Sequence, residues 1–213
     1  MRSARTIPLL ALVLFASSPA MAQEHHPWMG TLYVGYGKIF ESDNTSRFGV
    51  PGGGIALHGG AYRMLKPTLG LGLEAGYQHY GEQAYTIPGE ESGNAGFSSV
   101  HLTLQALAQG GEGGIRPFGL IGAGWYSLRT TTSGQLLLPD GTPIPGNHFE
   151  DKRNDSRFGA NIGAGVQFKA SEKSSVRFGI EARGHMIIQG WPEKNGGTGT
   201  LEAGTLAVGI HFK

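Results

Sequence analysis

The chain has 213 residues, of which 37 are glycine and none is cysteine, and its 17 basic and 16 acidic side chains give a net charge of +1. This balance argues against the basic surface of a nucleic-acid-binding protein, so no nucleic-acid partner is predicted, and the lack of cysteine excludes a fold held by disulfides. Beyond residue 22 no segment approaches 18 consecutive apolar residues, which excludes helical membrane spans there.

Residues 1–22 have the three parts of a secretory signal peptide, in the expected order. Two arginines lie near the start, an apolar stretch follows, and the segment closes with Ala-Met-Ala, a typical cleavage pattern. We predict cleavage between Ala22 and Gln23. The apolar stretch is too short to cross a bilayer as a helix. Without this segment, 15 basic side chains face 16 acidic ones, and the net charge becomes −1.

Eight later segments alternate between apolar residues and polar or small ones. In the clearest, Leu69, Leu71 and Leu73 share one face while Glu74 lies on the other. Period-2 alternation indicates a β-strand with two different surroundings. The segments have 11–14 residues each, and a tilted strand needs about 9–11 to cross a membrane. We place the strands at residues 30–40, 53–65, 69–80, 97–108, 117–129, 158–169, 175–188 and 200–212.

The connections between these strands alternate in length. Short turns are expected at residues 66–68, 109–116 and 170–174, and longer loops at 41–52, 81–96, 130–157 and 189–199. This asymmetry is typical of transmembrane barrels, whose periplasmic turns are short. We therefore predict one all-β domain at residues 30–213, an eight-stranded antiparallel up-and-down transmembrane β-barrel. Residues 23–29 would form a short periplasmic segment before it, and both termini would be periplasmic. A soluble lipocalin-like barrel, with its apolar rows turned inward, is the alternative fold.

Charged residues occupy the predicted lumen face of two strands that lie opposite each other in such a barrel. From their heights along the strands, we expect Glu74, Arg177, Glu181 and Arg183 to form an ion-pair network, joined by His101, Gln105 and Gln167. Buried charges must be paired. Because side chains fill an eight-stranded barrel, this network should plug the lumen. A narrow small-solute channel is the alternative.

Aromatic residues gather near the strand ends, as in the interfacial girdles of membrane barrels. The periplasmic girdle is predicted to contain Phe118, Phe168, Phe178 and Phe212, and the outer girdle Tyr36, Phe40, Tyr77, Tyr80, Trp125, Tyr126 and Trp191.

Four motifs together resemble one family. PFGLIGAGWY at residues 117–126, FGANIGAGVQF at 158–168 and VRFGIEARGHM at 176–186 are similar to strands of small OmpA/OmpX-like outer-membrane barrels. The ending LAVGIHF resembles the C-terminal signal read by the barrel-assembly machinery, and its alternate residues are Leu206, Val208, Ile210 and Phe212. Lys213 departs from that pattern, because the family usually ends on the aromatic residue. The resemblance implies an integral outer-membrane protein in contact with lipopolysaccharide.

Such barrels include adhesins, anchors, enzymes and channels, so the family fixes no activity. We expect a structural or surface-interaction role, with an extracellular ligand bound through residues 81–96 and 130–157, and a monomer without cofactor or metal. The triplet 136–138, three leucines before a Pro-Asp-Gly turn signal, suggests two strand extensions joined by a hairpin. It would be either an exposed contact patch or, as we prefer, packed on its own hairpin.

A lipid-binding or lipid A-modifying barrel is the enzyme alternative. Ser99 and His101 would share a face, but it is the lumen face, and no acid partner is evident. The adjacent His25 and His26, and acidic residues in the loops, do not amount to a metal site.

Overall fold

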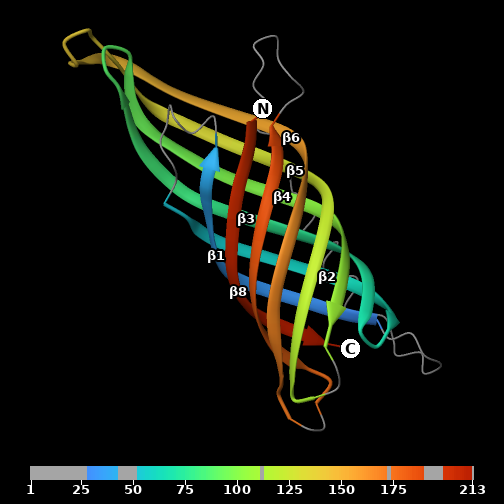
Figure 1. Ribbon diagram of the computed structural model, residues 1–213. Coiled ribbons are helices and arrows are strands. Elements are labelled where there is room, and N and C mark those ends of the chain that lie inside the picture. Colours follow the sequence, from blue (N-terminus) through green and yellow to red (C-terminus); the bar gives the residue numbers. More distant parts are fainter. Residues whose placement is uncertain (1–27, 43–51, 111–112, 172–173, 190–198, 213) are drawn as a thin grey trace, which may run out of the picture.

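A computed structural model of the protein describes residues 28–42, 52–110, 113–171, 174–189 and 199–212. Here eight antiparallel strands form a closed barrel in sequence order (Figure 1). They are β1 (Trp28–Ser42), β2 (Gly54–Lys66), β3 (Leu69–Ile87), β4 (Glu91–Gln109), β5 (Ile115–Leu137), β6 (Pro143–Lys169), β7 (Arg177–Gln189) and β8 (Gly199–Phe212). The ring closes where β1 pairs with β8, with Gly30 opposite Phe212. The predicted fold class is confirmed.

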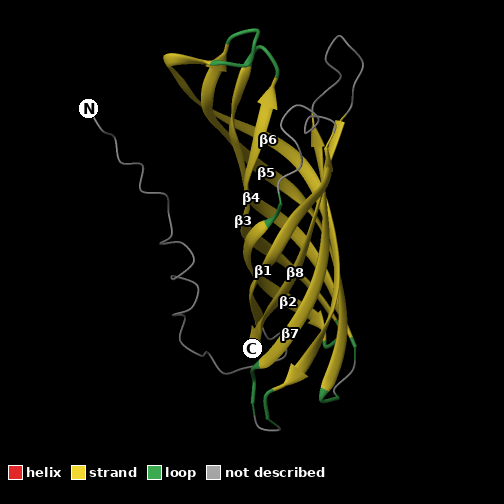
Figure 2. Cartoon of the chain, turned by 90° about the vertical axis from the view of Figure 1, so that its left-hand side faces the viewer, coloured by secondary structure: helices red, strands yellow, loops and turns green. Residues whose placement is uncertain are grey.

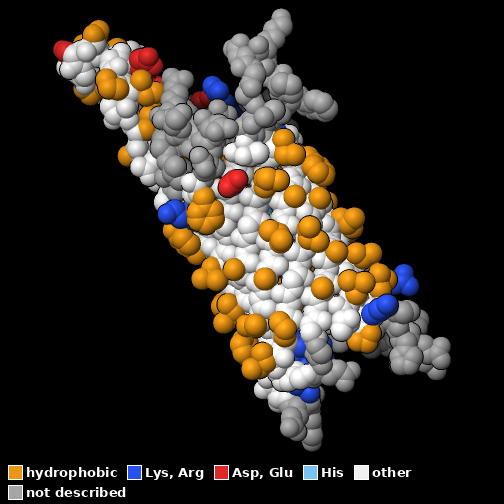
Figure 3. All heavy atoms as spheres, viewed as in Figure 1, with side chains coloured by type: hydrophobic (Ala, Val, Ile, Leu, Met, Phe, Trp, Pro, Cys, Tyr) orange, Lys and Arg blue, Asp and Glu red, His pale blue; other side chains and the backbone are white. Residues whose placement is uncertain are grey.

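The alternation in the sequence separates the two faces of the wall. Leu73 and Ile162 expose 57% and 66% of their surface on the outside, while Glu74 and Arg183 expose 1% and 4% inside. Figure 3 shows apolar side chains over the height of the barrel wall on the face in view. A soluble lipocalin-like barrel would have the opposite arrangement, so that alternative is wrong. Within the described residues, no helix has the length and apolar character to cross a bilayer.

Two clusters of buried apolar side chains occupy the interior at different heights. The first contains Met29, Tyr33, Tyr62, Met64, Leu107, Phe118, Leu120 and Ala207. The second contains Ile39, Tyr80, Tyr126, Ile187, Leu201 and Ala203. Along β7, Arg183 lies between Gly179, which approaches Tyr33 of the first cluster, and Ile187 of the second. A polar layer therefore separates the two clusters.

Three aromatic residues assigned to the girdles are part of this interior instead. Phe118, Tyr80 and Tyr126 are buried, so their assignment to the membrane interface was wrong. The reason is the strand period: Trp125 points outward, so its neighbour Tyr126 must point inward. The other described girdle residues, Tyr36, Phe40, Tyr77, Trp125, Phe168, Phe178 and Phe212, face outward. Trp191 lies outside the described residues.

The barrel has one tall side. Pairing of β2 with β3 ends at Gln78, and pairing of β6 with β7 begins at Gly159. Beyond these points β3, β4, β5 and β6 continue together as a four-stranded sheet, which we call the blade (residues 82–96 and 130–157). Figure 2 shows it rising above the barrel at the end opposite the C-terminus. We call the other end of the barrel, where β1 begins and β8 ends, the terminal end.

A glycine bulge marks the change from barrel to blade. The register between β3 and β4 shifts between His79 and Glu82, and Gly81 has a φ of 79°. One extra residue in β3 reverses its alternation. Consequently Glu74 and Tyr80, at even positions, are buried in the barrel, whereas Tyr85, at an odd position, is buried in the blade.

The blade corrects one expectation and confirms another. Residues 81–96 are not a loop: β3 runs to Ile87 and β4 starts at Glu91. Their sequence has few apolar side chains, so the period is weak, although residues 82–87 pair with residues 91–96. Residues 130–157 form the expected two strand extensions, joined by a turn. At the tip of this turn the amide of Gly141 donates to the carbonyl of Leu138 at 2.8 Å. In the leucine triplet the central Leu137 is buried, while its neighbours are exposed.

Candidate functional site

The best-defined polar site is the layer across the lumen. Its charged members are on β3 and β7, and strand alternation directs them inward because their neighbours carry the lipid-facing side chains. Glu74 lies on β3, and Glu181 and Arg183 lie two residues apart on β7. All three are almost completely buried.

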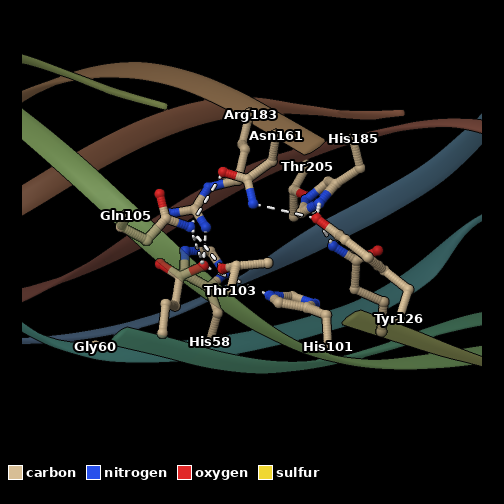
Figure 4. A network of polar contacts seen from close by, with 12 residues as sticks. His58, Gly60, His101, Thr103, Gln105, Tyr126, Asn161, Arg183, His185 and Thr205 are labelled. Carbon is tan, nitrogen blue, oxygen red and sulfur yellow. Dashed lines mark hydrogen bonds and ion pairs between the residues drawn. The ribbon is translucent and has the colours of Figure 1, made fainter. Parts of the chain in front are cut away.

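Arg183 holds the two carboxylates together. Its Nη1 donates to Oε1 of Glu74, and its Nε donates to Oε1 of Glu181 at 2.7 Å. His58 Nε2 is 3.2 Å from the same Glu181 oxygen, and His101 Nε2 is 3.5 Å from Glu74 Oε1. Figure 4 shows the guanidinium among these side chains. A buried cation between two buried anions compensates for the desolvation that each charge would otherwise suffer.

Neutral side chains extend the network across the lumen. The amide of Gln105 donates to Glu74 Oε1 at 3.3 Å, to Thr103 Oγ1 at 2.8 Å and to Asn161 Oδ1 at 3.1 Å. Asn161 in turn donates to the Tyr126 hydroxyl at 3.1 Å. These bonds connect β3 and β7 with β4, β5 and β6.

A second branch continues toward the blade end. His185 Nδ1 is 3.2 Å from the Tyr126 hydroxyl, and its Nε2 is 3.0 Å from the Gln78 amide. Gln78 also donates to Thr205 Oγ1 at 3.1 Å and accepts a hydrogen bond from Tyr80. The rings of His101 and Tyr126 stack at 5.3 Å. Below the layer Tyr33 stacks on His58 at 5.2 Å. Large side chains therefore fill the lumen above and below the charges.

Most of the sequence-predicted network is brought together, but two members are not. Glu74, Glu181, Arg183 and His101 meet as expected. Arg177 lies at the terminal end, where its guanidinium donates to the carbonyls of Gly113 and Gly114, so its place in the network was wrong. Gln167, also predicted to join, makes no hydrogen bond with its side chain. Both residues are beyond the height of the charges, near the strand ends where the barrel wall meets the turns.

Sequence reasoning missed several members of the network: His58, Gln78, Thr103, Tyr126, Asn161, His185 and Thr205. His58 lies on β2, where small or apolar residues occupy both faces, so the period gave no direction. The structure places His58 opposite Gly76 in the β2–β3 ladder, and its imidazole reaches Glu181 on β7. No signal in the sequence of β2 indicated this contact.

The Ser99 and His101 pair does not form a lipid-facing catalytic site. Both side chains are buried in the lumen, away from the acyl chains that a deacylase would attack. Within the described residues, no cluster of three or more histidine, cysteine or acidic side chains could hold a metal. Asp151 and Asp155 in the blade are paired with Arg153 and Arg157. His25 and His26 lie outside the described residues.

The C-terminal pattern has the expected orientation where it is described. Leu206, Val208 and Phe212 are exposed on the outer wall and Ile210 is half-buried, while Thr205, Ala207 and His211 at alternate positions are buried. Lys213, Ala22 and Gln23 lie outside the described residues, so the cleavage site stays a prediction.

Comparison with known proteins identifies the class. The chain belongs to the family described as outer membrane protein beta-barrel domain, which it matches over residues 8–213. It is therefore an integral β-barrel protein of the bacterial outer membrane. No curated protein sequence matches it.

The chain is also similar to several solved structures. Neisserial surface protein A (NspA) is 14% identical, with a TM-score of 0.55 over 89% of this chain and 99% of that chain. Ail, the attachment invasion locus protein of Yersinia pestis, is 16% identical, with a TM-score of 0.46 over 86% of this chain and 98% of that chain. The N-terminal barrel of Pseudomonas aeruginosa OprF is 19% identical, with a TM-score of 0.38 over 86% and 97%. At such identity the likeness to NspA shows the fold alone.

Proposed function

We propose that the protein is a surface-recognition barrel, in which the blade binds an extracellular macromolecule and the filled barrel anchors it. The observation that carries the proposal is the size of the blade. β5 has 23 residues and β6 has 27, whereas about 9–11 are enough to cross the bilayer. The additional length is an ordered, hydrogen-bonded sheet, and ordered recognition surfaces bind at a lower entropic cost than flexible loops.

The outward face of the blade has the chemistry of a polar binding surface. A shallow hollow of about 520 Å³ crosses β4, β5 and β6, and Asn94, Gln135, His148 and Glu150 are among its lining residues. Amide, imidazole and carboxylate groups there offer both donors and acceptors. Two glycines in the hollow allow close approach of the neighbouring strands, since a Cβ on Gly93 or Gly134 would meet backbone about 2 Å away.

The β6 edge of the blade is protected against unspecific strand pairing. Among the described residues, the outer part of β6 has no neighbour beyond β5. This edge carries intrastrand ion pairs, including Arg153 with Asp151 at 2.7 Å and Arg157 with Asp155. Charged side chains on an exposed edge discourage edge-to-edge aggregation. Recognition is therefore assigned to the polar face.

The experiment is adhesion of bacteria that display the protein. Wild type is compared with a shortened variant in which Asn-Gly replaces residues 83–95 and 132–151, positions that keep the register of both hairpins. The surfaces are a panel of immobilised matrix proteins and glycans, and heat-modifiable gel mobility checks folding. We expect adhesion above that of empty cells for the wild type only. The proposal is wrong if the wild type does not exceed empty cells, or if the shortened variant binds equally.

A finer comparison tests the hollow itself. The double variant Gln135→Ala with His148→Ala should lose binding, because it removes two lining side chains. Thr142→Ala, at the tip turn, is the matched control and should bind as the wild type does. Equal loss in both variants would contradict recognition by the hollow.

We also propose that the lumen is closed. The support is the ion-pair layer between the two apolar clusters. These side chains occupy the lumen, which a channel would need to keep filled with water. Single-channel recording of the purified protein in planar bilayers is the test. Steady conductance that depends on solute size would contradict this proposal and favour the narrow channel. A lipid A-modifying activity has no observation in its favour, and mass spectrometry of lipid A with and without the protein would detect it.

The topology in the cell is proposed from the asymmetry of the strands. The terminal end would be periplasmic and the blade extracellular, with residues 1–22 removed during export and residues 206–212 read by the barrel-assembly machinery. Lipopolysaccharide would surround a monomeric barrel. N-terminal sequencing of the mature protein should begin at Gln23, and protease added to intact cells should cut the blade.

A further inference from the structure

A small cavity opens at the terminal end, far from the blade. Its volume is about 130 Å³, and it lies where the turns after β4 and β6 approach the last residues of β8. Arg116, Arg177, Gln167, Ser175 and His211 are among the residues that line it. All of these except Ser175 have side-chain N–H groups that can donate hydrogen bonds, so the cavity is rich in donors.

Several polar atoms in this cavity are buried and have no partner. They are Nε of Arg116, both amide atoms of Gln167, Nδ1 of His211 and the acceptor Oε1 of Gln109. The first three residues expose 9%, 1% and 3% of their surface, and Gln109 exposes 5%. Buried polar groups in native proteins are nearly always hydrogen-bonded. Four side chains with unpartnered polar atoms around one cavity are the feature that points to a polar occupant there.

The charges specify the sign of that ligand. Arg116 and Arg177 lie close enough for their positive charges to repel each other. Arg177 is held in place by the carbonyl of Gly113, 3.3 Å from both Nη1 and Nη2. Among the described residues, neither guanidinium has a carboxylate partner in an ion pair. Two guanidiniums in one cavity, neither of them paired with a carboxylate among the described residues, attract an anion.

His211 fits an anion as well. Its Nε2 is hydrogen-bonded to the Tyr33 hydroxyl. When that hydroxyl donates, the neutral ring carries its proton on Nδ1, which then becomes a donor to the cavity. An anion would favour this tautomer.

We propose that this cavity binds an oxyanion of the phosphate class. Arg116, Arg177, the Gln167 amide and His211 supply donors from several directions, which suits a tetrahedral group with four oxygens. The volume corresponds to about four water molecules at ~30 Å³ each, enough for such a group. The phosphate can come from the headgroup of an inner-leaflet phospholipid or from a soluble phosphate ester.

The test is the thermal unfolding midpoint of the full-length protein in a nonionic, phosphate-free detergent. Inorganic phosphate at constant ionic strength should raise Tm relative to chloride by on the order of 4 °C near saturation. Acetate should raise it much less. No rise with phosphate, or an equal rise with acetate, overturns the proposal.

Variants locate the effect. Arg116→Gln and Arg177→Gln should each abolish the rise, while Arg129→Gln, an exposed arginine near the blade, should keep it. An undiminished rise in Arg116→Gln overturns the proposal. The variant Glu112→Gln with Glu172→Gln removes one carboxylate from the connection after β4 and one from the connection after β6, at positions outside the described residues. If phosphate acts only on this variant, the chain fills its own cavity and the proposal is wrong.

Two further probes separate the sources. Glycerol 3-phosphate represents the soluble ester and dihexanoyl phosphatidylglycerol the lipid headgroup. Whichever gives the rise at lower concentration identifies the source. The blade-shortened variant should respond to phosphate as the wild type does, so failure of the surface-recognition proposal would leave this one intact.

Discussion

The lumen and the blade contain the same kind of ion pair in opposite surroundings. Arg183 contacts Glu74 and Glu181 in a buried layer, whereas Arg153 contacts Asp151 with 83% of the arginine side chain exposed. Water can replace the exposed pair at little cost, but nothing can replace the buried one. The comparison teaches that geometry alone does not set the value of an ion pair, because desolvation decides what remains when one partner is removed.

The largest effect is expected from breaking the buried layer. Arg183→Met leaves two carboxylates unpaired and should lower the free energy of unfolding by about 3–5 kcal/mol, measured by guanidinium unfolding in phospholipid vesicles. Adding Glu74→Gln and Glu181→Gln should restore most of this loss, because no buried charge then lacks a partner. A single variant within 1 kcal/mol of the wild type would show that the layer is not desolvated.

A charge placed on the lipid face should have the next largest effect. Ile162→Arg, at mid-barrel, should cost about 2–4 kcal/mol in the same vesicle experiment. Leu136→Arg is the matched control: Leu136 is also exposed, at 41%, but in the blade, so its variant should cost little. Similar losses at both positions would mean that the blade lies in the membrane.

The junction between the two regions depends on one glycine. Gly81→Ala forces a side chain into a φ of 79°, with its Cβ 3.3 Å from the carbonyl of Gly53, and should cost about 1–3 kcal/mol. Gly119→Ala serves as the control, because its Cβ would make an ordinary contact, 3.8 Å from the carbonyl oxygen of Gly163. Hydrogen exchange should show faster opening of the blade in the first variant only. If hydrogen exchange of the blade is the same in Gly81→Ala as in the wild type, the bulge does not contribute to the stability of the blade.

The smallest effect is expected in the blade's own pairs. A hydrogen bond from Lys152, together with its charge, lowers the pKa of the Glu150 carboxyl below its usual range. The pair therefore stabilises the folded blade above the unfolded-state pKa, and this contribution disappears as the pH falls through the folded pKa. NMR titration should give a Glu150 midpoint below about 4.3, and Lys152→Met should raise it. A midpoint that does not move would mean that the pair is not formed in solution.

Alternation predicted the lumen residues well because a membrane imposes two very different surroundings on each strand. Glu181 and Arg183 are predicted to face the lumen because their neighbours Ile180 and Ala182 are apolar. The same reasoning applies to Ser99 and His101, whose neighbours are Val100 and Leu102. The same rule, applied strictly, would have placed Tyr126 inside as well. It failed on β2, where both faces carry small residues, and His58 was missed.

Arg177 shows a second limit of sequence reasoning. It has the same parity as Arg183, and its height along the strand suggested a position below Glu74. The barrel wall ends near it, and the carbonyls of a turn compete successfully for its guanidinium. Parity states which side a residue faces, but only the strand stagger and the turns decide what it meets there.

By itself the sequence determined which rows face lipid and which face the lumen, and hence the barrel, because transfer of side chains between hydrocarbon and a polar interior is a local property of each residue. The tertiary structure decided the rest. One partner of Arg183 is Glu74, 109 residues away on another strand. The blade exists because its four strands pair with one another, although their sequences have no apolar face. Both depend on how the closed ring aligns distant strands, which no local pattern encodes.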